Sequence, residues 1–321
     1  MRLLITAAGL QEVGALPPGV EPLIFDPAAP PRGFRAAFLS RELYFGGSRD
    51  RPPPAWLAFI EAVRQEPALE WLQIHSAGAD RPVYRELLAR GVRITTGAGA
   101  NAVPVAQTAV GMVLGLGRGL AGWIAAQSRR EWRPATAPFP PDLQGQKAVV
   151  VGLGPVGLEV GRLLAAIGML PIGISRRPRP APPPGFITTG IYRELPALLA
   201  GVSWLILCCP LSEETRGLVG AAELAAMPRG SFLINVSRGH VVDEAAALAA
   251  LREGHLAGAF MDVFAEEPLP PDSPWWDAPN CIVAPHAAGP SAGNLARAAA
   301  IFRRNLDLFL AGERMINEVE P

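Results

Sequence analysis

Lysine is almost absent from this chain of 321 residues. Of its 29 basic residues, one is Lys147 and the other 28 are arginines. A catalytic Schiff base needs a lysine amine, so that chemistry has almost no candidate here, and arginine must bind any anionic ligand. The formal net charge is zero, whereas binding to nucleic acid or to an anionic membrane is typical of chains with excess positive charge. We expect neither partner.

Cysteine is also scarce, and long uninterrupted hydrophobic runs are missing. The three cysteines, Cys208, Cys209 and Cys281, are odd in number and lie in apolar, strand-like segments, so a disulfide framework is not expected. No spacing typical of metal ligands occurs, and we expect no metal. Proline and glycine interrupt the longest apolar stretch, residues 195–211, which argues against a membrane span. No signal leader is recognisable after Met1, and the chain is expected to be soluble and cytoplasmic.

Apolar runs of strand length alternate with segments of helix length along the chain, which predicts parallel α/β structure. A long helix is expected at residues 103–127, between two series of strands, and a final helix at 291–310 is expected to return to the first series. The expected strands cover residues 3–6, 22–25, 36–39, 71–75 and 92–95 in the first series and 147–151, 170–174, 203–208, 231–236, 258–262 and 281–284 in the second.

A glycine motif follows the expected strand 147–151 and begins a helix-like segment. A strand, a tight turn and a helix at this spacing are typical of a dinucleotide-binding unit. The first glycine permits the turn, the second lets the backbone approach the pyrophosphate, and the third lets the helix pack on the strand, whose amides then hold the phosphates. The residues expected to bind the cofactor here are Gly152, Gly154, Pro155, Val156 and Gly157.

The next expected strand, residues 170–174, runs into Ser175, Arg176 and Arg177. An NAD-selective site usually has an acidic residue at this distance from the glycine motif, because a carboxylate accepts from the ribose 2′-hydroxyl. A hydroxyl and two guanidinium groups instead favour a 2′-phosphate. We therefore favour NADP(H) over NAD(H). The alternative is that the two arginines belong to a solvated loop.

Polar residues follow several of the expected strands, where ligands bind in parallel sheets. Reduction of a carbonyl by hydride needs a proton donor that titrates near neutral pH, and imidazole is best suited. Among the four histidines, His286 is best placed, whereas His240 and His255 are expected at the surface and His75 in a packing role. The other polar residues after strands are Ser76-Ala77-Gly78, Ser237-Arg238-Gly239, Asp262 and Glu267.

Together these blocks resemble the D-isomer-specific 2-hydroxyacid dehydrogenases, a family that contains glyoxylate/hydroxypyruvate reductases. The similarity covers nearly the whole chain, and the order and spacing of the blocks are more specific than any one of them. The matching blocks are Ser76-Ala77-Gly78-Ala79-Asp80, residues 142–146 before the glycine motif, residues 209–215, Ile234-Asn235-Val236-Ser237-Arg238-Gly239, residues 261–269, and Ala284-Pro285-His286.

The resemblance implies a role for each polar residue. Arg238 would bind the substrate carboxylate and keto oxygen. His286 would protonate the carbonyl oxygen, and Glu267 would hold the imidazole and favour its protonated form. The loop Ser76-Ala77-Gly78 would bind the substrate carboxylate through backbone amides. Asp262 would lie beside the nicotinamide, in an orienting role. Further cofactor contacts are expected from Cys209, Pro210, Thr215, Val236 and Ser237.

We therefore predict an α/β protein of two doubly wound parallel-sheet domains. A flavodoxin-like substrate domain is expected at residues 1–100 and 288–321, and a Rossmann dinucleotide-binding domain at residues 101–287. The expected activity is reduction of a small 2-keto acid, similar to glyoxylate or hydroxypyruvate, to the D-2-hydroxy acid. Apolar surface on the helix 103–127 and around Trp132, together with the dimers common in the family, predicts a homodimer.

Two alternatives remain on the same fold. One is a dinucleotide-sensing protein-interaction module, similar to the C-terminal-binding-protein corepressors, which keep the catalytic residues. The other is the same machinery with NAD and another substrate, such as formate or phosphite. Turnover of 2-keto acids, measured with both nucleotides, separates these alternatives.

Overall fold

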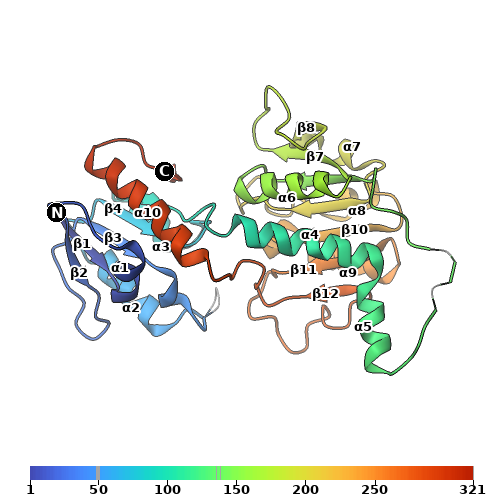
Figure 1. Cartoon of the computed structure of the whole chain (residues 1–321), viewed down its shortest axis with the longest axis horizontal. Coiled ribbons are helices and arrows are strands. Elements are labelled where there is room, and N and C mark those ends of the chain that lie inside the picture. The colour runs from blue at the N-terminus through green and yellow to red at the C-terminus, as the bar shows by residue number, and fades with distance from the viewer. Residues whose placement is uncertain (48–50, 135, 138, 321) are drawn as a thin grey trace. The chain divides into compact units, whose positions relative to one another are not determined.

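The computed structural model describes residues 1–47, 51–134, 136–137 and 139–320. The chain divides into two compact units, one formed by Met1–Asn101 with Pro290–Pro321 and the other by Ala102–Gly289. Figure 1 labels most of the elements of both. The C-terminal helix α10 belongs to the same unit as the N-terminal strands, so the first unit is discontinuous in sequence.

The first unit is built on a parallel sheet in the order β2-β1-β3-β4-β5, the flavodoxin-like order. Neighbouring strand residues face opposite sides, so Leu3 packs with α1 and α10 whereas Leu4 packs with α2 and α3. Both faces are therefore covered, as a parallel sheet requires. The elements are β1 (Arg2–Ile5), α1 (Ala7–Val13), β2 (Glu21–Ile24), β3 (Ala36–Leu39), η1 (Arg41–Tyr44), α2 (Pro54–Arg64), β4 (Trp71–Ile74), α3 (Pro82–Ala89), β5 (Arg93–Thr95) and α10 (Asn294–Leu310).

Aromatic and polar contacts fix α10 on this sheet. The ring of Phe302 stacks on Trp71, with centroids 5.3 Å apart, and on Phe38 at 4.4 Å. Below them, the buried amide of Asn305 donates to Gln73 Oε1 over 2.9 Å. Such buried polar contacts are satisfied only when the helix is in place, so the C-terminal segment completes the core of the first unit.

The second unit has a parallel sheet in the order β12-β11-β10-β9-β6-β7-β8, which contains the Rossmann arrangement on either side of β6. Helices α4 and α6 pack together over this sheet (Figure 1). The elements are α4 (Ala102–Arg118), α5 (Leu120–Ser128), β6 (Lys147–Val151), α6 (Pro155–Ala166), β7 (Leu170–Ser175), β8 (Thr188–Ile191), η2 (Tyr192–Glu194), α7 (Leu195–Leu199), β9 (Trp204–Leu207), α8 (Ala221–Ala226), β10 (Ser231–Asn235), η3 (Gly239–Val241), α9 (Glu244–Arg252), β11 (Leu256–Met261) and β12 (Cys281–Val283).

The sheets confirm the predicted fold class, but one predicted helix is wrong. The segment expected as a single helix at 103–127 is broken at Gly119, which has a left-handed φ of 74° that glycine adopts without steric cost. The two helices, α4 and α5, are bent by 71°. Within the described ranges, no single helix is both long and apolar enough to cross a membrane, and the bent pair α4 and α5 passes that test only together.

Candidate active site

The loop between β6 and α6 has the shape that a dinucleotide needs. At Gly152, where φ is 98°, an added Cβ would lie 2.6 Å from the backbone of Cys209, and at Gly157 it would lie 1.8 Å from the Gly152 carbonyl oxygen. These glycines permit close packing. A Cβ at Gly154 would instead meet nothing within 4 Å, so the open space at the start of α6 is available for a pyrophosphate. The loop therefore fits the cofactor.

A cluster of arginines follows β7, beside this loop. Arg176 Nε lies 3.1 Å from Glu214 Oε2 in an exposed ion pair, and Ser175 Oγ donates to the Arg177 carbonyl over 2.8 Å. Arg179, two residues further along the chain than Arg177, donates from Nη2 to the Leu153 carbonyl over 2.9 Å. The guanidinium of Arg179 therefore lies against the glycine loop. Sequence reasoning missed it, although its spacing from Arg177 across one proline was a usable signal.

The segment after β9 is held by its own hydrogen bonds. Thr215 is buried, and its Oγ1 donates to the Pro210 carbonyl over 2.7 Å and accepts from the Ser212 amide over 2.8 Å. Cys209 is buried beside Gly152, and burial raises the pKa of its thiol to about 12, which leaves it inert as a nucleophile. The side chain of Thr215 therefore shapes this loop.

Two side chains that follow neighbouring strands meet at the core of the site. His286 Nδ1 lies 2.9 Å from Glu267 Oε2, and Glu267 Oε1 accepts from the Phe264 amide over 3.1 Å. Burial alone would raise the pKa of Glu267, but the bond to His286, its charge, the Phe264 amide and the charge of Arg238 together hold that pKa below its usual value. With Nδ1 engaged, Nε2 is the nitrogen that can face a substrate.

Asp262 organises the backbone that carries His286. The histidine has a left-handed φ of 54°, an uncommon conformation for a residue with a side chain. Its amide donates to the Asp262 carbonyl over 2.9 Å, and the buried Oδ1 of Asp262 accepts from the amides of Ala287 at 2.7 Å and Ala288 at 3.0 Å. Burial raises the pKa of Asp262 to about 6, against the lowering effect of the His286 charge and these amides. Sequence reasoning did not find this use of Asp262.

A close approach of two backbone segments brings Arg238 near Glu267 and His286. A Cβ on Gly239 would lie 1.9 Å from the carbonyl carbon of Phe264, so glycine lets the segment after β10 touch the segment after β11. Arg238 Nη1 donates to the Ser237 carbonyl over 2.7 Å, and Ser237 Oγ donates to Asn235 Oδ1 over 2.7 Å. Val236, half-buried, directly follows β10. The second unit thus gathers Arg238 with Glu267 and His286.

The loop Ser76-Ala77-Gly78 follows β4 in the first unit. Ser76 Oγ donates to the Gly78 carbonyl over 2.9 Å, and the Ser76 carbonyl accepts from the Gly97 amide over 2.9 Å. No described residue accepts a hydrogen bond from the amides of Ala77 or Gly78. Since two unpartnered amides on a half-exposed loop suit an anion, the loop fits the carboxylate-binding role implied for it.

The remaining histidines do not add to this site. His255, expected at the surface, is half-buried, and its Nε2 lies 2.9 Å from the Leu224 carbonyl. His240 is half-buried in η3. Within the part of the chain that the structure describes, no group of three or more His, Cys, Asp or Glu side chains is arranged to hold a metal ion.

Comparison with known proteins agrees with this geometry. The family model described as "D-isomer specific 2-hydroxyacid dehydrogenase, NAD binding domain" matches residues 110–288. A putative 2-hydroxyacid dehydrogenase of Haemophilus influenzae is 34% identical over 71% of this chain and 73% of its own length. A glyoxylate reductase of Korarchaeum cryptofilum is 32% identical over 79% of this chain and 76% of its own length.

Solved structures give the same result. The D-isomer specific 2-hydroxyacid dehydrogenase of Xanthobacter autotrophicus, in complex with NADPH and MES, superposes with a TM-score of 0.77 at 30% identity, over 100% of this chain and 98% of that one. An NADPH-dependent glyoxylate/hydroxypyruvate reductase of Sinorhizobium meliloti, in complex with NADP and malonate, gives a TM-score of 0.73 at 28% identity, over 99% and 96%. The resemblance read from the sequence blocks is confirmed. This chain belongs to the D-isomer-specific 2-hydroxyacid dehydrogenase family and is an NAD(P)-dependent 2-hydroxyacid dehydrogenase.

Proposed function

We propose that this enzyme reduces a small 2-keto acid, with glyoxylate and hydroxypyruvate as the leading candidates, to the D-2-hydroxy acid and prefers NADPH. The observation that carries the proposal is the 2.9 Å contact between His286 Nδ1 and Glu267 Oε2, with the charge of Arg238 beside it. A proton donor, its carboxylate partner and a guanidinium at one place are the groups that carbonyl reduction needs. The names of the glyoxylate reductase relatives support the choice of substrate.

Each polar residue of the candidate site then has a role in the proposed reaction. Arg238 binds the substrate carboxylate and keeps the keto oxygen polarised, because its guanidinium remains charged and planar. When bound, the nicotinamide supplies a hydride to the keto carbon. His286 Nε2 gives its proton to the oxygen, so that the carbonyl becomes a hydroxyl and the imidazole becomes neutral. Glu267 stabilises the imidazolium before the transfer and fixes the ring. Asp262 holds the His286 backbone in place.

The preference for NADPH is supported by the residues that follow β7. None of the three positions 175–177 has an acidic side chain, and Arg179 lies against the glycine loop. The guanidinium groups of these arginines would bind the 2′-phosphate by charge-assisted hydrogen bonds. Glu214, which pairs with Arg176, must give way or move when the phosphate binds, because two anions then compete for one guanidinium.

A panel of 2-keto acids, assayed with NADPH and NADH in parallel, tests the proposed function. Glyoxylate and hydroxypyruvate are expected to be reduced with higher kcat/KM than larger apolar 2-keto acids, and the product is expected to be the D isomer. Oxidation of formate or phosphite without keto-acid reduction would instead support other chemistry on the same fold. Tight nucleotide binding with no turnover, together with nucleotide-dependent association with another protein, would support the interaction-module alternative.

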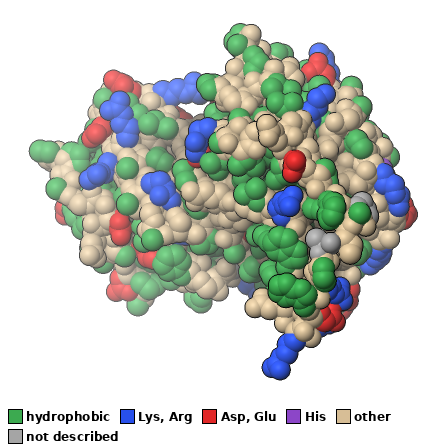
Figure 2. Space-filling model, turned by 45° about the vertical axis from the view of Figure 1, so that its right-hand side comes forward, with side chains coloured by type: hydrophobic (Ala, Val, Ile, Leu, Met, Phe, Trp, Pro, Cys, Tyr) green, Lys and Arg blue, Asp and Glu red, His purple; other side chains and the backbone are tan. Residues whose placement is uncertain are grey.

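A homodimer is expected through α5 and the segment that follows it. Trp123 and Ile124 are 60% and 66% exposed, and Trp132 is 94% exposed. Figure 2 shows hydrophobic side chains gathered in this region, and an apolar patch of this kind usually marks a protein interface. Light scattering at micromolar concentration is expected to give about twice the chain mass of 33.9 kDa.

The same measurement on variants locates the interface. Trp123→Asp is expected to shift the mass toward that of a monomer, because an unpaired carboxylate in an apolar interface is costly. Ile187→Asp, at a residue 48% exposed elsewhere in the same unit, is the matched control and should leave the mass unchanged. A monomeric mass for the parent protein, or an unchanged mass for Trp123→Asp, would contradict the assignment.

A further inference from the structure

We propose that Arg41 and the groups around it in the first unit form a subsite for a second carboxylate on the substrate, so that the enzyme also accepts four-carbon 2-keto dicarboxylates such as oxaloacetate. This inference rests on the proposed function, since it extends the substrate class of the same site. It assigns a specificity role to residues that the reaction itself does not use.

The subsite lies at the carboxyl ends of two neighbouring strands. Arg41 comes two residues after β3, and His75 follows β4 directly and precedes the loop Ser76-Ala77-Gly78. Strands β3 and β4 are paired in parallel, with Leu39 opposite Ile74. The two side chains therefore start from the same edge of the sheet as the loop expected to bind the first carboxylate, which is the edge where ligands bind in this fold.

Arg41 is a half-buried cation with no counter-ion among the residues that the structure describes. No carboxylate or carbonyl of any described residue pairs with its guanidinium, and burial lowers its pKa with no opposing contribution from a neighbour. A partly desolvated charge without a partner is costly, and an anionic ligand removes that cost. The arrangement therefore suits an anion that arrives with the substrate.

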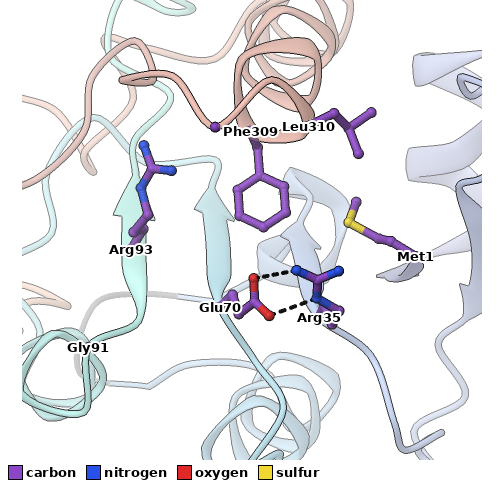
Figure 3. Close-up of a pocket in the computed structure, with 8 residues that line it drawn as sticks. Met1, Arg35, Glu70, Gly91, Arg93, Phe309 and Leu310 are labelled. Carbon is purple, nitrogen blue, oxygen red and sulfur yellow. Dashed lines mark hydrogen bonds and ion pairs between the residues drawn. The ribbon is translucent and has the colours of Figure 1, made fainter.

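Other arginines of the same unit show the contrast. Figure 3 shows Arg35 joined to Glu70 by two hydrogen bonds, of 2.7 and 2.8 Å, in a cavity of about 470 Å³. Arg93, which lines that cavity too, makes two contacts with Glu318, at 2.6 and 2.9 Å. These guanidinium groups have their anions within the chain. Both arginines that line that cavity therefore have carboxylate partners, whereas Arg41 has none among the described residues.

His75 does not supply the missing partner. Its buried Nδ1 has no hydrogen-bond partner among the described residues. Burial and then the charge of Arg41 lower the pKa of the ring to about 4, although a bond to the Leu39 carbonyl raises it. The ring is neutral at pH 7 and leaves the charge of Arg41 uncompensated. A polar group of a ligand, or a water that it brings, could satisfy both residues.

Arg81 and two aromatic rings form a fixed wall near His75. The guanidinium carbon of Arg81 lies 4.6 Å from the ring centre of Trp56 and 5.5 Å from that of Tyr44, and its Nη2 donates to the Tyr44 hydroxyl over 2.7 Å. The Tyr44 ring lies 5.6 Å from that of His75. Stacking of this kind holds a guanidinium in one orientation. Arg81 thus adds a second, preorganised positive charge to the subsite.

Glu42 and Asp80, the acids next to Arg41 and Arg81 in sequence, form no ion pair with Arg41 among the described residues. Glu42 Oε1 accepts from Ser40 Oγ over 2.6 Å and also from Thr6 Oγ1, so hydroxyls that follow β3 and β1 hold its carboxylate. Asp80 lies toward Arg81 and Tyr84, where its charge acts on the Tyr84 hydroxyl together with that of Arg81. Arg41 makes no contact with either carboxylate among the described residues, and a neutral hydroxyl such as that of hydroxypyruvate would not offset its charge. A distal carboxylate does.

The test compares two four-carbon acids that differ at one end. Oxaloacetate carries a distal carboxylate where 2-ketobutyrate carries a methyl group. In the parent enzyme we expect kcat/KM for oxaloacetate to exceed that for 2-ketobutyrate by about tenfold or more, since a charge-assisted hydrogen bond contributes at least this much. Arg41→Ala should remove most of the difference, chiefly through KM, and should change glyoxylate reduction by less than about twofold. Arg35→Ala, on the same sheet, is the control and should keep the difference.

Loss of the subsite and loss of keto-acid reduction give different experimental results. No preference for oxaloacetate in the parent enzyme, or equal losses for glyoxylate and oxaloacetate in Arg41→Ala, overturns the subsite while glyoxylate reduction stands. If the parent enzyme reduces no keto acid, the subsite is tested by titration calorimetry, which measures the binding of oxaloacetate to the parent enzyme and to both variants. Weaker binding to Arg41→Ala than to Arg35→Ala supports the subsite, and equal binding overturns it. An unchanged circular dichroism spectrum confirms that the variants fold.

Discussion

Replacing His286 by alanine is expected to lower kcat for 2-keto acid reduction by a factor of about 10² to 10⁴, the usual contribution of a general acid. The alanine variant keeps Arg238 and the glycine loop, so its affinity for NADPH should change little. Steady-state kinetics give kcat, and fluorescence titration of NADPH gives the affinity. A loss in kcat without a loss in cofactor affinity indicates an interaction made in the transition state.

The pH dependence gives a second, independent readout. Reduction should weaken as pH rises, because the imidazole then loses the proton that it donates. The pKa of Glu267 is held below its usual value, so this carboxylate stays ionised through neutral pH. It therefore does not cause the decline in reduction as pH rises. In Glu267→Gln the ring of His286 loses the carboxylate that holds its Nδ1, and kcat at neutral pH should fall.

A matched control separates catalysis from packing. His255→Gln removes an imidazole from the same unit, at a residue that contacts Leu224 and takes no part in the proposed chemistry, and should keep most of the activity. An alanine variant of His286 that retains most of its reduction rate would remove the histidine from the mechanism. An unchanged kcat in Glu267→Gln would remove the carboxylate as the partner of His286.

Much of the fold was predictable because buried parallel strands are continuous apolar runs. The runs at 36–39 and 147–151 coincide with β3 and β6. Strand β8 was not predicted, since it is a short edge strand of threonines, glycine and isoleucine with no fully buried residue. The break at Gly119 was missed because the apolar pattern continues through it. A single left-handed glycine bends the chain without changing its hydropathy.

The candidate site was predictable where strand order determines proximity. Strands β10, β11 and β12 are neighbours, so residues just beyond their carboxyl ends, including Arg238 and His286, come together. The contact partners of Arg179 and Glu214 were not predictable, although the spacing of Arg179 from Arg177 was a signal for a further arginine near the cofactor. Loops of irregular length carry both residues, and no periodicity specifies where a loop returns. The role of Asp262 depends on the left-handed backbone of His286, which no local pattern reveals.

Cofactor choice is expected to depend on the arginines that follow β7. In the double variant Arg176→Ala with Arg179→Ala, the KM for NADPH should rise by about ten- to over a hundredfold, since a hydrogen bond to a charged group contributes about 1.5 to 3 kcal/mol. The KM for NADH should change little, because NADH lacks the 2′-phosphate. The measurement is steady-state kinetics with both nucleotides at low and high salt. Salt should weaken the binding of NADPH more than that of NADH.

Glu214 provides a control of opposite sign. Its exposed ion pair with Arg176 contributes about 1 kcal/mol or less, and Glu214→Gln frees the guanidinium for the phosphate. The KM for NADPH should therefore fall by up to about fivefold in Glu214→Gln, while that for NADH stays the same. Arg252→Ala, an exposed arginine of α9, should affect neither nucleotide. Equal kinetic constants for both nucleotides in the parent enzyme, or equal losses for both in the double variant, would show that these arginines are solvated loop residues, because a phosphate-specific contact must distinguish the two cofactors.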